Sequence, residues 1–275
     1  ILDTPLDARL SKVDEQGWAA AWDWGDIYDD MEANAAGIDL YAEMVRRTVH
    51  DPATARALVP HYPLGCKRLI IDTDYYATFN RPHVRLVDLR EDPIVRITPT
   101  GVETRAAHVE LDVLVLATGF DAMTGALDRI DIAGRDGVRL RDVWADGPRT
   151  MLGLQVAGFP NLFTITGPGS PSVHANMVLA IEQHTDWIID CLAHLDARGA
   201  RTIEATSDAQ DDWVAHVASL VDGTVKASDA CNSWYTGANV PGKPRVYLAY
   251  AAGLPAYRQH CDTVAAAGYE GFTID

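Results

Sequence analysis

The stretch from residue 111 to residue 121 most constrains what this chain can fold into. Residues 113–117 are apolar without alternation, which is typical of a strand covered on both faces. Thr118 and Gly119 then end the run, and a glycine at this place lets a ligand approach the backbone closely. Ligands of open α/β sheets lie beyond the carboxyl ends of the strands. The sequence therefore predicts a buried strand that ends at a ligand site, although a buried strand with an ordinary turn has the same pattern.

Size and composition are those of an ordinary globular protein. The chain has 275 residues, 48% of them hydrophobic and 23% charged, so we expect a packed core in one large or two smaller domains. The net charge of −16 disfavours nucleic acid or an anionic membrane as a partner. No apolar run reaches the length of a membrane span, and no signal peptide opens the chain.

The cysteines are far apart in the sequence and form no C-x-x-C motif. We therefore expect reduced thiols and a cytoplasmic location. These cysteines are Cys66, Cys191, Cys231 and Cys261.

The first 60 residues are predicted to be helical. Apolar residues share one face of a helix over residues 39–49. Asp51 and Pro52 supply an N-cap and a first-turn proline for a second helix that ends near residue 60. The aromatic residues that precede these helices are expected to pack in the core. They are Trp18, Trp22, Trp24 and Tyr28.

Short strands are predicted from residue 67 to residue 109. Residues 68–72 and 84–89 are apolar runs, and residues 93–97 and 102–104 form a hairpin around a turn. A short helix is expected within residues 72–82.

The rest of the chain is predicted to alternate strands and helices. Residues 121–144 have the pattern of loop and short strand. A second buried strand is expected over residues 161–166 and leads into a glycine turn. Two helices follow, over residues 174–195 and 208–221. The remaining elements are a glycine-rich loop over residues 233–243, a strand over 246–250, and a tail of helix and coil. The inner face of the helix over 174–195 is expected to hold Met177, Ile181, His184, Ile188, Cys191 and Leu195.

Four stretches occur in an order that resembles one enzyme family. Residues 116–121 are similar to the ATG motif of flavin-dependent monooxygenases. Residues 65–68, 167–172 and 233–243 narrow the match. Together these stretches resemble the C-terminal part of the type I Baeyer–Villiger monooxygenases, the group of phenylacetone and cyclohexanone monooxygenase.

The resemblance implies an α/β fold made of the C-terminal portions of two Rossmann-like dinucleotide-binding domains, one for NADP and one for FAD. Residues 1–64 would form a helical insert of the NADP domain, residues 65–111 the end of that domain, and residues 112–275 the C-terminal part of the FAD-binding domain. No G-x-G-x-x-G fingerprint occurs in the chain, whereas members of the family carry two. We therefore expect the N-terminal half of the enzyme to be missing from this sequence.

The activity implied by the resemblance is insertion of one oxygen atom next to a ketone carbonyl, giving an ester or a lactone. The expected cofactors are FAD and NADP(H), and the expected substrates are a small-molecule ketone and O2. One alternative is an N-hydroxylating or thioether-oxidising flavin monooxygenase. Another is a non-catalytic fragment that lacks the nucleotide-binding motifs.

Arg68 is the candidate catalytic residue. Arginine stays ionised under nearly all conditions and can hold its charge beside an oxyanion. By resemblance, Arg68 matches the arginine that stabilises negatively charged oxygen during the reaction, and Lys67 matches a residue near the phosphates of the nicotinamide cofactor. Judged from the residues alone, a solvated lysine–arginine pair at the start of a strand is the alternative.

The glycine turns supply most of the candidate cofactor ligands. A strand, a glycine turn and a helix start place free backbone amides beside a bound ring or anion. The resemblance implies that the turn at residues 167–169 lies against the flavin and that Trp234 contacts NADP and closes the site. The candidate cofactor-binding residues are Lys67, Thr118, Gly119, Asp121, Gly167, Pro168, Met177 and Trp234.

The residues after this turn are the candidate substrate pocket. The resemblance places Ser172, Val173 and His174 at pocket positions, and an exposed histidine near a helix N-terminus is the alternative for His174. No G-x-S-x-G motif supports a serine nucleophile. No metal site is predicted, since the histidines at 174, 184 and 194 do not share a helical face and no H-E-x-x-H motif occurs.

Overall fold

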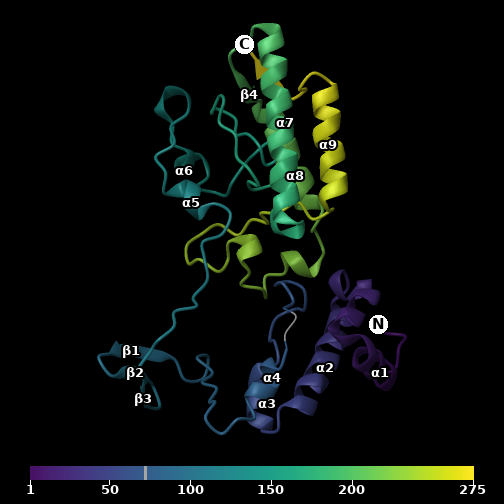
Figure 1. Ribbon diagram of the computed structural model, residues 1–275, viewed down its shortest axis with the longest axis vertical. Coiled ribbons are helices and arrows are strands. Elements are labelled where there is room, and N and C mark those ends of the chain that lie inside the picture. Colours follow the sequence, from purple (N-terminus) through teal and green to yellow (C-terminus); the bar gives the residue numbers. More distant parts are fainter. Residues whose placement is uncertain (71–72) are drawn as a thin grey trace. The chain divides into compact units, whose positions relative to one another are not determined.

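The computed structural model describes residues 1–70 and 73–275, and the chain forms two compact units (Figure 1). The N-terminal unit is Ile1–Gly119 and the C-terminal unit is Phe120–Asp275. The elements of the N-terminal unit are α1 (Leu6–Gln16), η1 (Gly17–Asp23), η2 (Gly25–Tyr28), α2 (Met31–Thr48), α3 (Pro52–Leu58), α4 (Tyr75–Thr78), β1 (Ile94–Thr98), β2 (Gly101–Thr104) and β3 (His108–Glu110).

The helices of the N-terminal unit begin where the sequence predicts caps. The Asp30 side chain accepts a hydrogen bond from the amide of Ala33 at the start of α2, so this helix is longer than the predicted one. Asp51 does the same for the amide of Thr54 at the start of α3, with Pro52 in the first turn as predicted. The apolar face of α2 is buried, which confirms the predicted helical pattern. Of the expected aromatic core, Trp24 is buried, and the side chains of Trp18 and Trp22 lie outside the described residues.

A three-stranded antiparallel sheet follows in the order β1-β2-β3. Its first two strands form the predicted hairpin, with Thr98 paired to Gly101 at the turn. The short helix predicted within residues 72–82 is confirmed as α4. The sequence also predicts strands at 68–72 and 84–89. Residues 68–70 and 84–89 form no strand, so these predictions are wrong for them, and Ile71 and Asp72 lie outside the described residues.

The stretch over residues 111–121 is not a buried strand. Val113 is 75% exposed, Val115 is 79% exposed and Phe120 is 88% exposed. A buried strand needs neighbours that pair its backbone and cover both faces. Among residues 1–70 and 73–275 no strand pairs with this stretch, so its apolar pattern alone cannot make it a strand.

The C-terminal unit is built mainly from helices. Its elements are α5 (Gly125–Asp128), η3 (Arg135–Gly137), α6 (Leu140–Val143), η4 (Ser172–His174), α7 (Met177–Arg198), β4 (Ile203–Ala205), α8 (Ser207–Ser219), η5 (Val225–Ala227), η6 (Trp234–Thr236), α9 (Leu254–Ala266) and β5 (Phe272–Ile274). The tail predicted as coil instead forms β5, which pairs antiparallel with β4. The chain therefore has α/β content, but both sheets in the described part are antiparallel.

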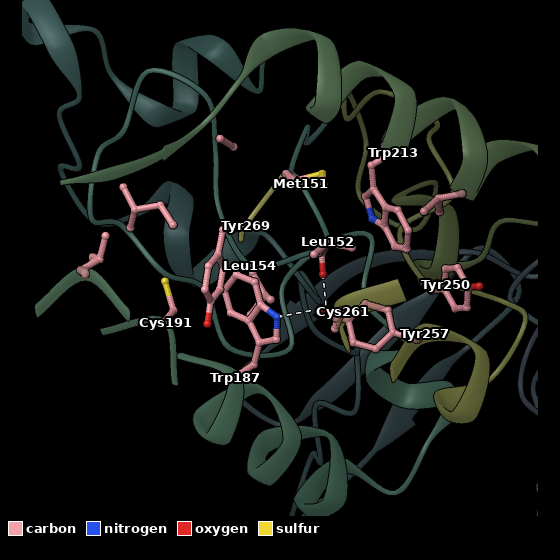
Figure 2. Packing of buried hydrophobic residues seen from close by; sticks show 14 residues of the cluster. Met151, Leu152, Leu154, Trp187, Cys191, Trp213, Tyr250, Tyr257, Cys261 and Tyr269 are labelled. Atoms are coloured by element: carbon pink, nitrogen blue, oxygen red, sulfur yellow. Dashed lines mark hydrogen bonds between the residues drawn. The ribbon is translucent and has the colours of Figure 1, made fainter. Parts of the chain in front are cut away.

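The helices α7, α8 and α9 pack around one apolar cluster (Figures 1 and 2). Trp213 of α8 stacks on Tyr250 with the ring planes 5° apart and the centroids 5.4 Å apart. The indole N–H of Trp187 donates to the carbonyl oxygen of Cys261, which ties α7 to α9 (Figure 2). Irregular segments complete the cluster with Met151, Leu152 and Leu154.

The predicted inner face of α7 is only partly buried. His184, Cys191 and Leu195 lie in the core, whereas Met177 and Ile181 are exposed because the first turns of the helix extend beyond the cluster. Cys191 and Cys261 are free thiols, as expected, and both are buried. Cys66 and Cys231 are not free thiols, so the expectation of reduced cysteines is wrong for these two.

Two further strand predictions in the C-terminal unit are wrong. Residues 161–166 and 246–250 are irregular extended segments. The amides of Val246 and Leu248 bond to η6, and that of Tyr250 bonds to the carbonyl oxygen of Ser170, so no single neighbouring strand forms a ladder.

Among the helices of residues 1–70 and 73–275, none has the length and apolar character that a membrane span requires.

Replacing Asn34 with alanine should destabilise the N-terminal unit. The buried Asn34 amide donates to the carbonyl oxygens of Ile27 and Leu64 and accepts from the amide of Leu64. Because Asn34→Ala leaves these backbone groups buried and unpaired, we expect the free energy of unfolding to fall by about 2–3 kcal/mol in chemical denaturation. The matched control Glu32→Ala, on the exposed side of the same helix, should change it by less than about 0.5 kcal/mol. Equal effects would contradict this assignment.

His184 should make the C-terminal unit less stable in mild acid. Burial lowers the pKa of His184 from 6.5 to about 4. Between these values the unfolded chain binds a proton that the folded chain does not, so the free energy of unfolding falls as the pH decreases. We expect a loss of about 3 kcal/mol from pH 7 to pH 4, which is absent from His184→Gln. Parallel pH profiles of the two proteins in denaturant titrations would show that His184 is not the group responsible.

Candidate functional site

The glycine turn at residues 167–169 is held by hydrogen bonds from several parts of the C-terminal unit. The Gly169 amide donates to the carbonyl oxygen of Leu248 over 2.9 Å. The Trp213 indole N–H donates to the carbonyl oxygen of Gly169 over 3.0 Å, and the Thr150 hydroxyl donates to that of Pro168 over 2.6 Å. Because these donors and acceptors come from distant segments, the turn is fixed by tertiary structure.

Space and backbone conformation both require the two glycines of this turn. Gly169 has a φ of +85°, which a residue with a side chain rarely adopts. A Cβ atom at Gly167 would lie 2.5 Å from the hydroxyl oxygen of Thr164 and 2.6 Å from the carbonyl oxygen of Gly153. Larger residues would therefore displace the turn.

The turn does not offer the run of free amides that the sequence predicts. The amide of Gly169 is used by Leu248, and that of Ser170 donates to the carbonyl oxygen of Gly167. At the start of α7, the Asn176 side chain accepts from the amides of Val178 and Leu179. These amides are satisfied inside the protein, so they are not available to an anion.

Two tyrosine rings lie against His174 of η4, next to the turn. Its imidazole Nε2 lies 2.7 Å from the hydroxyl oxygen of Tyr247. The same imidazole stacks on Tyr235, with centroids 5.0 Å apart and planes 15° apart. Burial, with the nearby Tyr235, raises the pKa of the Tyr247 hydroxyl far above its ordinary value, so Tyr247 stays protonated. His174 is half-buried and partnered, so the alternative of an exposed histidine is wrong.

Trp234 joins this group through Tyr235. The two rings lie 4.1 Å apart at their centroids, and Trp234 is half-buried. The Ser233 side chain caps their short helix η6 by accepting from the amide of Tyr235. The structure therefore brings together Trp234 and His174, which are 60 residues apart in the sequence. We refer to His174, Trp234, Tyr235 and Tyr247 as the aromatic group.

The other candidate pocket and flavin residues differ in their surroundings. Ser172 is buried with a φ of +43°, and its hydroxyl contacts the sulfur of Met123 at 3.2 Å. Val173 is half-buried, Pro168 is buried, and Met177 is exposed at the first position of α7. Ser172 is thus enclosed by the protein, whereas Met177 is accessible.

A lysine ties the glycine-rich loop to the segment after residue 119. The Lys243 ammonium pairs with the Asp121 carboxylate, lies 2.5 Å from the hydroxyl oxygen of Thr124, and lies 3.6 Å from the Asp128 carboxylate. The Asn239 side chain donates to the carbonyl oxygen of Phe120 over 3.1 Å. Asp121, a candidate cofactor ligand, is therefore engaged within the protein and holds this loop in place.

The remaining candidates belong to the N-terminal unit. The Lys67 ammonium lies 4.2 Å from the centroid of the Tyr62 ring, and Arg68 is exposed. Thr118 and Gly119 are exposed, and a Cβ atom at Gly119 would meet no atom within 4 Å. The chemical role of Arg68 and the ligand roles of these residues stay predictions.

Two residues of the site were not predicted from the sequence. Tyr247 lies in a segment predicted as a strand, and no sequence signal marks it as a partner of His174. Lys243 stands in the glycine-rich stretch quoted for the resemblance, but only the structure pairs it with Asp121.

The described cavity beside the turn is too small for a substrate. The space between Pro168, Gly169, Trp213 and Tyr247 is ≈ 50 Å³. In residues 1–70 and 73–275 no group of three or more histidine, cysteine or acidic residues can hold a metal ion.

Several known proteins are similar to this chain, although no protein-family model matches it. It is 41% identical to acetone monooxygenase (methyl acetate-forming) of Gordonia sp. (strain TY-5) over 272 residues, which cover 97% of the chain and 51% of that protein. It is 37% identical to phenazine N-monooxygenase PhzNO1 of Lysobacter antibioticus over 91% of the chain and 46% of that protein. The solved structure of an oxidized steroid monooxygenase bound to NADP has a TM-score of 0.89 and 45% identity, over 99% of the chain and 52% of the structure. The chain thus spans about half the length of the curated relatives it matches.

Replacing Lys243 should loosen the glycine-rich loop. Lys243→Met removes the ammonium that contacts Asp121 and Thr124, whereas Lys243→Arg keeps the charge. We expect amide hydrogen exchange over residues 238–243 to rise about fivefold in Lys243→Met and much less in Lys243→Arg. Lys226→Met, a half-buried lysine elsewhere in the unit, serves as the control. Unchanged exchange in Lys243→Met would show that the loop is held by its backbone contacts alone.

Proposed function

As a homologue of the Baeyer–Villiger monooxygenases over about half of their length, this chain is, we propose, the C-terminal part of a flavin-dependent monooxygenase. The enzyme inserts one oxygen atom next to a ketone carbonyl, giving an ester or a lactone, and uses FAD, NADPH and O2. The observation that carries this proposal is 41–45% identity over nearly the whole chain to monooxygenases, one of them named for the conversion of acetone to methyl acetate.

The domain organisation follows the same proposal. Residues 1–64 form a helical insert, residues 65–111 the end of an NADP-binding domain, and residues 112–275 part of an FAD-binding domain of the Rossmann type. The exposed apolar residues 113–117 support this organisation, since they have the composition of a central parallel strand but no partner among the described residues. We propose that strands from the N-terminal half of the enzyme supply those partners.

The residues present fit the ring and sugar parts of the cofactors better than the phosphates. The half-buried Trp234 can pack against a ribose or a flat ring, and the open space at Gly119 admits close approach of a ligand. The chain has no phosphate-binding fingerprint, and amides near the second turn are already paired. FAD, when bound and reduced by NADPH, supplies the activation of O2.

Each candidate residue then has a defined task. Arg68 holds a permanent positive charge next to the oxygen of the substrate carbonyl, where negative charge develops during the reaction. His174 lines the substrate pocket in an orientation set by its contacts with Tyr235 and Tyr247. Thr118, Gly119, Asp121, Gly167, Pro168 and Met177 would hold FAD, and Lys67 and Trp234 would hold the nicotinamide cofactor. Asp121 would contribute indirectly, by anchoring Lys243 and its loop.

A second candidate function is oxygenation of a ring nitrogen. The similarity to phenazine N-monooxygenase PhzNO1 favours it. Attack on oxygen by a nitrogen lone pair places no negative charge on a substrate carbonyl, so this reaction does not require a cation at residue 68. The two candidates therefore differ in how they depend on Arg68.

Turnover of ketones by Arg68 variants of the full-length protein tests the proposal. Arg68→Ala should lower kcat for a ketone by about 10²–10³, and Arg68→Lys should lose less, because removal of one group that stabilises an oxyanion costs this much in other enzymes. Arg81→Ala, an exposed arginine of the same unit, should be unaffected. Ester formation is measured by product analysis, with an aromatic N-heterocycle as the competing substrate. N-oxide formation that exceeds ester formation and tolerates Arg68→Ala would contradict the Baeyer–Villiger activity.

The isolated 275-residue segment should bind FAD poorly. It lacks both phosphate-binding fingerprints, so most of the contacts to the pyrophosphate are absent. We expect purified segment to be colourless and to take up well under one FAD per chain in equilibrium dialysis. A stoichiometric yellow chromophore on the segment alone would show that the chain holds a complete FAD site.

A further inference from the structure

A buried chain of hydrogen bonds connects the glycine turn to the core of the C-terminal unit. The amide of Thr166 donates to Nδ1 of His184 over 2.9 Å. On the other side of the ring, Nε2 of His184 lies 2.8 Å from the hydroxyl oxygen of Tyr257, which lies 2.5 Å from the carbonyl oxygen of Leu152. The side chains of His184 and Tyr257 are both 0% exposed, so water does not substitute for these bonds.

The positions of the protons in this series of hydrogen bonds follow from the groups at its two ends, the Thr166 amide and the Leu152 carbonyl oxygen. The Thr166 amide can only donate, so Nδ1 of His184 carries no proton. The Leu152 carbonyl oxygen can only accept, so the Tyr257 hydroxyl proton points to it. The proton of the imidazole is therefore on Nε2, which donates to the Tyr257 oxygen. Burial lowers the pKa of His184 to about 4, which agrees with a neutral ring in this one tautomer.

Thr166 is the residue that this chain of bonds fixes. It has a φ of +51°, which is unusual for a β-branched residue and is kept only where the surroundings enforce it. Thr166 directly precedes Gly167, so its backbone angles set the direction in which the turn leaves the preceding segment. If the bond to His184 were lost, the half-buried Thr166 amide would lose its partner within the protein and Thr166 could return to the extended region.

We propose that His184 and Tyr257 are positioning residues that hold the Thr166 backbone in its conformation and thereby orient the glycine turn toward the ligand. We refer to the hydrogen bonds of His184 with Thr166 and Tyr257 as the clamp. The pair touches neither the turn's glycines nor the aromatic group by any hydrogen bond in the described part of the chain, so it acts through the Thr166 backbone. The identity of the ligand as FAD rests on the proposed function. The clamp itself rests only on the geometry of the C-terminal unit.

Two substitutions of nearly equal shape separate the hydrogen bond from packing. His184→Asn keeps an acceptor near the position of Nδ1, whereas His184→Leu has none. Tyr257→Phe removes the acceptor that holds the proton on Nε2. Cys191→Ala, two turns further along α7 in the same core, is the matched control. All four are made in the full-length protein, and Thr166 amide exchange and the FAD dissociation constant are measured.

We expect Thr166 exchange to rise at least about tenfold in His184→Leu and by a smaller factor in Tyr257→Phe, with His184→Asn and Cys191→Ala close to the unaltered protein. The FAD dissociation constant should rise in the same order, by about tenfold in His184→Leu. If His184→Leu does not fold, Tyr257→Phe against Cys191→Ala carries the comparison.

The outcomes separate the clamp from the proposed function. Equal Thr166 exchange in Tyr257→Phe and Cys191→Ala, or in the asparagine and leucine variants, would overturn the clamp. Faster exchange of the Thr166 amide with an unchanged FAD dissociation constant would contradict the role of the clamp in orienting the turn. The expected exchange pattern in a protein that binds no FAD even unaltered would support the clamp and contradict the proposed function.

Discussion

The buried polar groups of one irregular turn must all find partners, and the C-terminal unit is arranged around that requirement. Residues 166–170 are neither helix nor strand, and among these described residues only the Ser170 amide bonds to another backbone group of the turn, the carbonyl oxygen of Gly167, so most of their backbone groups need partners from elsewhere. His184 of α7 and Trp213 of α8 instead supply an acceptor and a donor, and the segment at 248–250 supplies both. These side chains also belong to the buried aromatic core or border it. The same packing that stabilises the unit therefore sets the geometry of its candidate site.

Local sequence signals predicted the elements that local interactions determine. The caps at Asp51 and the apolar spacing in α2 identified helices, and the turn after Thr98 identified the hairpin, because each depends on residues a few positions apart. The stretches at 113–117, 161–166 and 246–250 were predicted as strands and are not. A strand exists only where a neighbour pairs with it, and in the described part of the chain no strand pairs with these stretches. Apolar composition alone does not contain this information.

The candidate site was predictable to a similar degree. The resemblance identified His174 and Trp234, and the structure brings both into one aromatic group. It could not reveal Tyr247, nor the pairing of Lys243 with Asp121, because these depend on how two loops meet. The amides of Gly169 and Ser170 are not free as expected, since the carbonyl oxygens of Leu248 and Gly167 accept from them. The role of Arg68 stays a prediction, because it depends on a ligand and on the rest of the enzyme.

Amide hydrogen exchange of the segment without any cofactor tests most directly whether the protein alone builds the turn. If it does, the amides of Gly169 and Tyr250 exchange as slowly as that of Cys191 in the middle of α7, while those of Val113 and Val115 exchange at rates typical of unpaired backbone. Exchange at Gly169 and Tyr250 as fast as at Val115 would contradict a preformed turn, and would mean that the bound ligand organises this part of the site.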